Sequence, residues 1–158
     1  MGASSLPRRR RRAREIALQL VYELDLRPDL TADEAIEMYP WETELTDVTD
    51  YAKALVSGVY EHVDDIDAML REHIVGWRTE RMVAVDRASI RLALFEGIIG
   101  RKVPIAVAIS EAVELTKMFG TMESGSFVNG VLGKIVRSSY VDSTETECSA
   151  EAASDYDS

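Results

Sequence analysis

Six arginines lie between residues 8 and 14, and no acidic residue interrupts them. A guanidinium group is planar and permanently charged, so it matches phosphate oxygens and stacks on bases. On a helix, positions 11, 15, 18 and 22 share one face, which places Tyr22 on a side that carries arginines. An aromatic ring beside arginines suits unstacked RNA bases. A basic tail, with Tyr22 packed on a neighbouring helix, explains the same residues equally well. The six are Arg8, Arg9, Arg10, Arg11, Arg12 and Arg14.

A second group of polar side chains lies near the predicted start of a helix within residues 111–134. Ser124, Ser126 and Asn129 surround that helix N-terminus, where backbone N–H groups and the helix dipole favour an anionic phosphate. Asn129 also interrupts a stripe that is otherwise apolar. The alternative is an asparagine that satisfies loop backbone, and helical periodicity does not choose between the two.

The other residues able to do chemistry form no catalytic pattern. His62 and His73 lie among acidic residues, but metal ligands come as tighter clusters, and acids on a solvated helix face account for this group. Cys148 has no organised base beside it. The glycines do not form a phosphate-binding loop after a strand. We therefore expect no enzyme activity, no metal site and no cofactor.

Charge is distributed unevenly along the chain, whose formal net charge is −10. The arginines of the N-terminal segment are balanced by the acids of residues 141–158, so the middle of the chain is itself acidic. A concentrated basic patch on an acidic body confines contact with phosphates to that patch. This pattern favours limited, placed contact over general coating of a nucleic acid.

Helical periodicity dominates the chain, and no alternating strand pattern of useful length occurs. The first helix should bury Ile16, Ala17, Leu20 and Val21, and Thr31 with Glu34 forms a capping box for the second. A fifth helix, apolar almost all round, belongs in the middle of a bundle. In the last helix, Phe127 is expected to point inward. The seven helices are predicted at about residues 7–26, 31–39, 47–62, 64–74, 80–99, 104–119 and 126–139.

The length of 158 residues suits one domain. Residues 1–7 are expected to be a flexible end, 8–140 a helical domain and 141–158 a disordered acidic tail rich in Ser, Thr, Asp and Glu. No apolar run approaches a membrane span, and no apolar core follows the basic stretch as in a signal peptide. Cys148 is the only cysteine, which excludes an internal disulfide. The cytoplasm is the predicted compartment.

Three blocks of the sequence resemble the bacterial transcription antitermination factor NusB family. RRAREIALQLVY resembles its opening helix, and VDRASIRLALFE resembles its central helix. EAVELTKMFG, followed after a short gap by FVNGVLGK, looks like its C-terminal signature. The blocks occur in the family's order and spacing, so the resemblance covers nearly all of the predicted domain.

The resemblance implies an all-α fold of seven helices in two small subdomains packed together. It also implies binding to the boxA element of ribosomal RNA leader transcripts, together with NusE, a ribosomal protein of the small subunit. That complex, with RNA polymerase and other Nus factors, promotes read-through of terminators. The chain could be a monomer or a homodimer, and no membrane partner is implied.

Carried over by position, the resemblance assigns roles to individual residues. Tyr22, Glu80 and Asp86 match positions that face the ribosomal-protein partner, where acids suit a basic protein. The segment 120–126 departs from the family by lacking a lysine, and Gly97 stands where a larger apolar residue is typical. The predicted RNA-binding residues are Arg8, Arg9, Arg11, Arg12, Arg14, Gln19, Tyr22, Glu123, Ser124, Ser126 and Asn129.

Two other functions remain open from the residues. The same fold occurs at the front of certain ribosomal RNA cytosine methyltransferases, but no glycine-rich strand–helix unit follows here. The acidic body would also suit a purely protein-binding helical scaffold.

Overall fold

The computed structural model describes residues 5–77 and 82–138, which contain seven α-helices and no strand. The predicted all-α class and the number of helices are confirmed. A 3-10 turn, Trp41–Thr43, precedes α3, and a π-helical turn, Phe95–Ile99, continues α5. The helices are α1 (Leu6–Leu26), α2 (Ala32–Met38), α3 (Thr46–Glu61), α4 (Val63–His73), α5 (Ala84–Leu94), α6 (Ile105–Phe119) and a last helix at residues 124–138.

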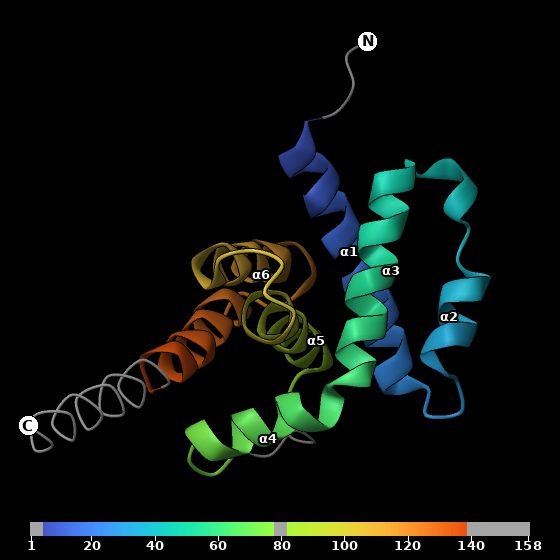
Figure 1. The fold of residues 1–158 in the computed structure, drawn as a ribbon. Helices are drawn as coiled ribbons and strands as arrows, with labels where there is room; N and C mark the ends of the chain where they lie inside the picture. The colour runs from blue at the N-terminus through green and yellow to red at the C-terminus, as the bar shows by residue number, and fades with distance from the viewer. Residues whose placement is uncertain (1–4, 78–81, 139–158) are drawn as a thin grey trace, which may run out of the picture.

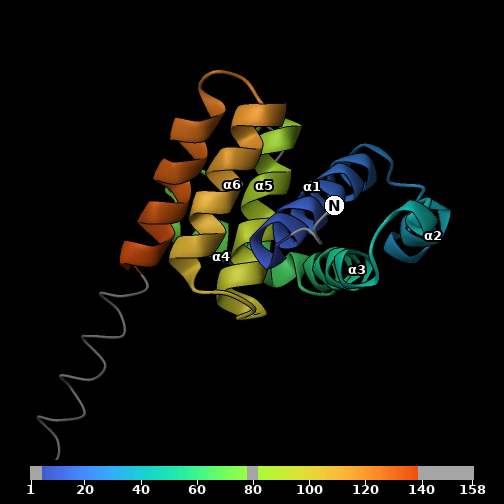
Figure 2. The same cartoon turned by 90° about the horizontal axis from the view of Figure 1, so that it is seen from above.

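The helices form two groups that meet along α1 and α5 (Figures 1 and 2). In the first group α1 packs lengthwise on α3, and α2 covers the outer side of that pair. In the second, α5, α6 and the last helix stand side by side (Figure 2). Helix α4 leads from α3 to the second group and packs against α5. This arrangement agrees with the predicted two small helical subdomains.

Local sequence signals account for most helix bounds. Thr31 and Glu34 form the capping box, in which each side chain accepts a hydrogen bond from the other residue's backbone N–H. Gly120 ends α6, where its backbone N–H donates to the Thr116 carbonyl. The predicted buried stripe of α1 is confirmed, because Ile16, Ala17, Leu20, Val21 and Leu24 are all buried in the core.

The structure differs from the predictions at several places. Helix α1 begins at Leu6, inside the segment expected to be flexible, and α5 begins at Ala84, later than predicted. Phe127 was expected to point inward, but 43% of its surface is exposed, because Val128, Val131 and Leu132 fill the core-facing side of its helix. Residues 1–4 and 139–158 lie outside the described residues, so the tail stays a prediction.

Gly97 brings α6 close to the π-helical turn. A Cβ at this position would lie 2.6 Å from Ile105 Cδ1 and 3.0 Å from Ala108 Cβ. A larger residue would therefore push the start of α6 away from Phe95–Ile99. The larger apolar residue that the resemblance implies would therefore not fit here without a shift of α6.

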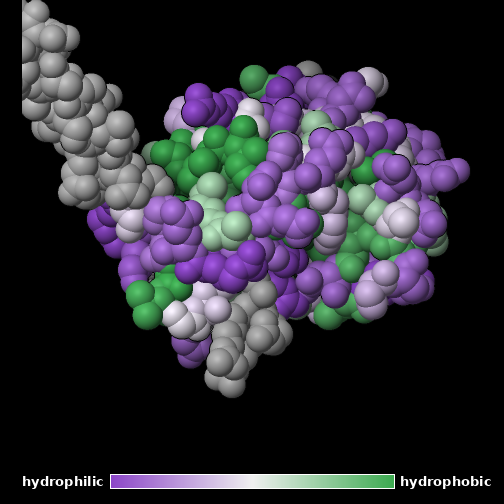
Figure 3. Space-filling model, turned by 60° about the horizontal axis from the view of Figure 1, so that its bottom comes forward, coloured by the Kyte–Doolittle hydropathy of each residue, from purple (hydrophilic) through white to green (hydrophobic). Residues whose placement is uncertain are grey.

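The face shown in Figure 3 is largely hydrophilic, with apolar areas separated by polar side chains. No described helix is both long and apolar enough to cross a membrane. Within residues 5–77 and 82–138, no three His, Cys, Asp or Glu side chains gather as metal ligands do.

Candidate nucleic-acid interface

Three arginines on the first turns of α1, the half-buried Arg9 and the exposed Arg11 and Arg12, pair with acids of other helices or of the loop before α3. These pairs join residues 32 to 100 positions apart, so they fix how the arginine face of α1 meets its neighbours. Arg8 is exposed and makes no ion pair with an acid of the described chain. The pairs are Arg9 with Asp47 at 2.5 Å, Arg11 with Glu111 at 3.2 Å and Arg12 with Glu44 at 2.7 Å.

Arg14 differs from these arginines because it is 6% exposed. Its Nε donates to both carboxylate oxygens of Glu96, at 2.9 Å each, and Tyr51 Oη also donates to Glu96. Burial lowers the pKa of Arg14, but the hydrogen bonds and charge of Glu96 outweigh it, so the pKa is raised. Burial also raises the pKa of the Tyr51 phenol, and Glu96 adds to that rise. Arg14 therefore joins α1 to the π-helical turn, and its guanidinium is not presented at the surface.

An apolar cleft of about 260 Å³ lies beside the exposed arginines, between α1, α5 and α6. Gln19 and Tyr22 form its rim from α1, both exposed, as the helix spacing predicted for Tyr22. Phe119, the final residue of α6, lines the same cleft and is 41% exposed. Two aromatic rings from segments far apart in the chain thus share one opening, which suits the stacking of an unpaired base.

The start of the last helix holds the second predicted group, and its members divide by exposure. Ser124 is buried, and its Oγ accepts a hydrogen bond from the Thr121 backbone N–H at 2.9 Å. It therefore shapes the turn before the helix. Glu123, Ser126 and Asn129 are exposed.

A groove of about 450 Å³ continues from Asn129 along α6. It is lined by Ala106, Ile109, Ser110, Val113, Glu114 and Asn129. Glu111, at the same level of α6 as the groove but not among its lining residues, accepts hydrogen bonds from Arg11. The arginine face of α1 and the exposed side of the last helix therefore lie on either side of α6.

The model of the NusB family matches residues 11–137 of this sequence. The chain belongs to the NusB family. It is 40% identical over 136 residues to the transcription antitermination protein NusB of Symbiobacterium thermophilum, which covers 81% of this chain and 89% of that protein. It is 42% identical over 127 residues to the Bacillus subtilis protein of the same name. That alignment covers 80% of this chain and 94% of the Bacillus subtilis protein.

Solved NusB structures share the fold. T. maritima NusB superposes with a TM-score of 0.74 at 30% identity, over 87% of this chain and 93% of that one. A NusB solved with NusE and double-stranded RNA gives a TM-score of 0.73 at 29% identity, over 83% and 98%. The NusB family comprises antitermination factors and not enzymes, so the predicted lack of enzyme activity is confirmed.

The resemblance assigned two acids, Glu80 and Asp86, to the protein partner. Glu80 lies outside the described residues. Asp86 is 5% exposed, and its Oδ1 has no hydrogen-bond partner in the described part of the chain. In this conformation its carboxylate is not open to a partner, so the predicted contact stays a prediction.

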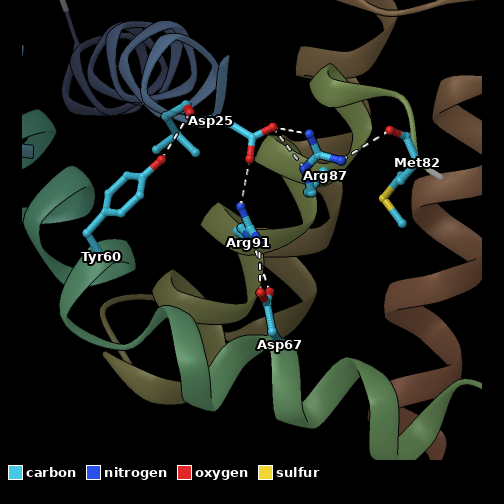
Figure 4. A network of polar contacts seen from close by, with 7 residues as sticks. Asp25, Tyr60, Asp67, Met82, Arg87 and Arg91 are labelled. Carbon is cyan, nitrogen blue, oxygen red and sulfur yellow. Dashed lines mark hydrogen bonds and ion pairs between the residues drawn. The ribbon is translucent and has the colours of Figure 1, made fainter. Parts of the chain in front are cut away.

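A partly buried ionic network, which includes the neighbour of Asp86 in the sequence, Arg87, was missed by sequence reasoning (Figure 4). Asp25, at the end of α1, accepts hydrogen bonds from Arg87 and from Arg91, the latter at 3.2 Å. Arg91 also binds both carboxylate oxygens of Asp67 on α4, at 2.8 and 3.1 Å. The network ties α1, α4 and α5 together. The signal was the pair of arginines four apart on a helix otherwise apolar, where buried charge requires a partner.

Proposed function

We propose that this chain binds the boxA element of ribosomal RNA leader transcripts together with the small-subunit ribosomal protein NusE. It would act in the cytoplasm, as a monomer or homodimer, in an RNA polymerase elongation complex with other Nus factors that reads through terminators. The observation that carries the proposal is the exposed edge formed by Arg11 and Arg12 on α1 beside the cleft of Gln19, Tyr22 and Phe119.

The ion pairs of this edge do not prevent RNA binding. An exposed arginine–carboxylate pair contributes only about 0–1 kcal/mol to stability. A phosphate replaces the carboxylate with equal or greater charge, and binding gains further from the release of counterions. Arg11 and Arg12 remain about half exposed, with side-chain exposures of 52% and 44%. They are therefore the primary phosphate contacts in our proposal.

Selectivity would come from neutral groups around the edge. Tyr22 and Phe119 offer ring faces to an unpaired base, and Gln19 offers an amide that both donates and accepts hydrogen bonds. Asn129 offers a second amide across α6. Glu123 is exposed and repels phosphate, so the RNA path should avoid that side of the last helix. Ser124 and Arg14 would act only through the shape of the edge, because both are buried.

NusE is proposed as partner because a NusB of 29% identity has been solved with NusE and double-stranded RNA. The chain's net charge of −10 would attract a basic protein to surfaces away from the arginines. The protein and the RNA would then occupy neighbouring surfaces, and each would strengthen the binding of the other if they also touch.

A titration of the full chain with boxA RNA and with a scrambled RNA of equal length tests the proposal. We expect tighter binding of boxA, a further gain with purified NusE, and weaker binding as salt rises. The double variant Arg11→Ala/Arg12→Ala should lose affinity, whereas Arg71→Ala, an exposed arginine of α4, should change little. Equal binding of both RNAs under all conditions would overturn the proposal. Loss of NusE binding alone in the double variant would favour a protein scaffold instead.

A further inference from the structure

Three cations beside α1 carry no ion pair, in contrast to most of the arginine run. Arg10, Arg101 and Lys102 have no carboxylate within ion-pair distance among residues 5–77 and 82–138. Arg101 and Lys102 are exposed, and Arg10 is half-buried. Arg8, Lys53 and Arg71 also make no ion pair with a described acid, so what distinguishes Arg10, Arg101 and Lys102 is that they gather at one place. Such a group attracts anions more strongly than arginines that carboxylates already neutralise.

The ring of Tyr51, on α3, brings two of these cations to one place. Arg10 Cζ lies 3.9 Å from the ring centroid, and Lys102 Nζ lies 5.8 Å from it. A guanidinium held against a ring keeps its N–H groups free to donate outward. In Figure 2 the yellow turn between α5 and α6 lies beside the N-terminal ends of α1 and α3. Arg10 and the adjacent pair Arg101 and Lys102, which lie 91 positions further along the sequence, thus form one charged group.

The backbone of the turn holds these cations in place. The π-helical turn closes with the Gly100 N–H donating to the Phe95 carbonyl at 2.7 Å. The Lys102 N–H then donates to the Glu96 carbonyl at 2.8 Å. Between them Arg101 adopts φ of 47°, a left-handed conformation that costs a non-glycine residue about 1 kcal/mol or more. An exposed arginine at a position that suits glycine is consistent with selection for its charge.

We propose that Arg10, Arg101 and Lys102 form a second phosphate-binding site, which holds the RNA backbone beyond the boxA edge. The site rests on the proposed function for its ligand class, RNA. Its position would carry the strand from the arginine face of α1 to the start of α6, where Ala106 opens the groove that ends at Asn129. RNA fits better than an acidic peptide, because every nucleotide supplies a phosphate and the site holds cations only.

The double variant Arg101→Gly/Lys102→Ala tests the site in the full chain. Glycine suits the left-handed backbone, so the fold should be retained, as thermal unfolding will show. We expect affinity for a long RNA, boxA with flanking nucleotides on both sides, to fall about tenfold at 0.1 M salt, and the salt slope to fall by about 1.4 for two lost phosphate contacts. Affinity for the short boxA core should stay within about twofold, since a site that contacts only flanking phosphates adds nothing there.

The control is Lys53→Ala/Arg71→Ala, which removes equal charge from exposed or half-buried positions on α3 and α4. The proposed site would be overturned if the salt slope of affinity for the long RNA did not change in the test variant. It would also be overturned if that slope fell equally in the control. Weaker NusE binding with RNA binding intact would assign the cations to a protein and also overturn it. The test variant and the control could both bind boxA and scrambled RNA equally well, which would contradict the boxA proposal. If the salt dependence of RNA affinity still falls only in the test variant, the phosphate site stands.

Discussion

Arg14 and Arg11 lie less than one helical turn apart on α1 and belong to the same run, yet they serve different purposes. Arg14 is buried on Glu96, whereas Arg11 is half exposed and pairs with Glu111 at the surface. A buried pair that loses one partner leaves an uncompensated charge, which costs about 3–5 kcal/mol. An exposed pair that loses one partner costs about 0–1 kcal/mol. Burial, rather than residue type, therefore divides the run into arginines that hold the fold and arginines free to bind phosphate.

The largest effect should follow from Glu96→Gln, which leaves the buried Arg14 with only the more distant Glu111, at 3.6 Å, as a countercharge. We expect the free energy of unfolding to fall by about 3 kcal/mol or more, measured by urea denaturation. The matched change at the surface, Glu111→Gln, should cost less than about 1 kcal/mol. A comparable loss in both variants would remove the distinction between the two regions.

Asp25→Asn should have an intermediate effect, because the Asp25 side chain is 15% exposed and serves two arginines. Arg91 retains Asp67, and Arg87 retains its hydrogen bond to the Met82 carbonyl. We expect a loss of about 2 kcal/mol by urea denaturation. A value below that of Glu111→Gln would show that burial does not order these ion pairs.

The variant Arg11→Ala/Arg12→Ala tests the exposed arginines of this comparison. The unfolding free energy should change by less than about 1 kcal/mol, because both pairs are exposed. The salt slope of boxA binding should fall by about 1.4, since each lost phosphate contact on a single strand contributes about 0.7. A large loss of stability in this variant would mean that the exposed arginines also hold the fold.

A modest, pH-dependent effect should be seen at Tyr60, whose hydroxyl donates to the Val21 carbonyl at 3.2 Å. Burial raises the pKa of Tyr60 to about 12, above the usual phenol value of about 10. Its contribution is thus complete below pH 10 and is lost as pH rises from 10 to 12. Tyr60→Phe should cost about 1 kcal/mol at pH 8 and flatten that part of the alkaline transition. An identical alkaline transition in both proteins would contradict the assignment.

The fold was largely predictable because its signals are local. The capping box at Thr31, the glycine after α6 and the apolar stripe of α1 each act within a few residues. The exposure of Tyr22 also followed from helix spacing. These positions needed no knowledge of which helices meet.

The burial of Arg14 and Asp86 was not predictable from spacing, since it depends on how separate helices pack. Glu96 reaches Arg14 across 82 positions, and no periodic pattern reports such a pairing. Phe127 was misplaced for a related reason, because its helix has more apolar residues than its buried side holds. Arg101 and Lys102 gave only a weak signal, two adjacent cations before Pro104.

The separation between Arg14 and Glu96 has a consequence for the order of events during synthesis. Translation at roughly 5–20 residues per second takes about 4–16 seconds to add the 82 positions between them. During that time α1 exists on the ribosome without Glu96, the carboxylate that neutralises Arg14. The arginine face of α1 therefore reaches its final form only after the second helical group has emerged and docked, so a nascent chain is not yet competent to hold RNA in the proposed way.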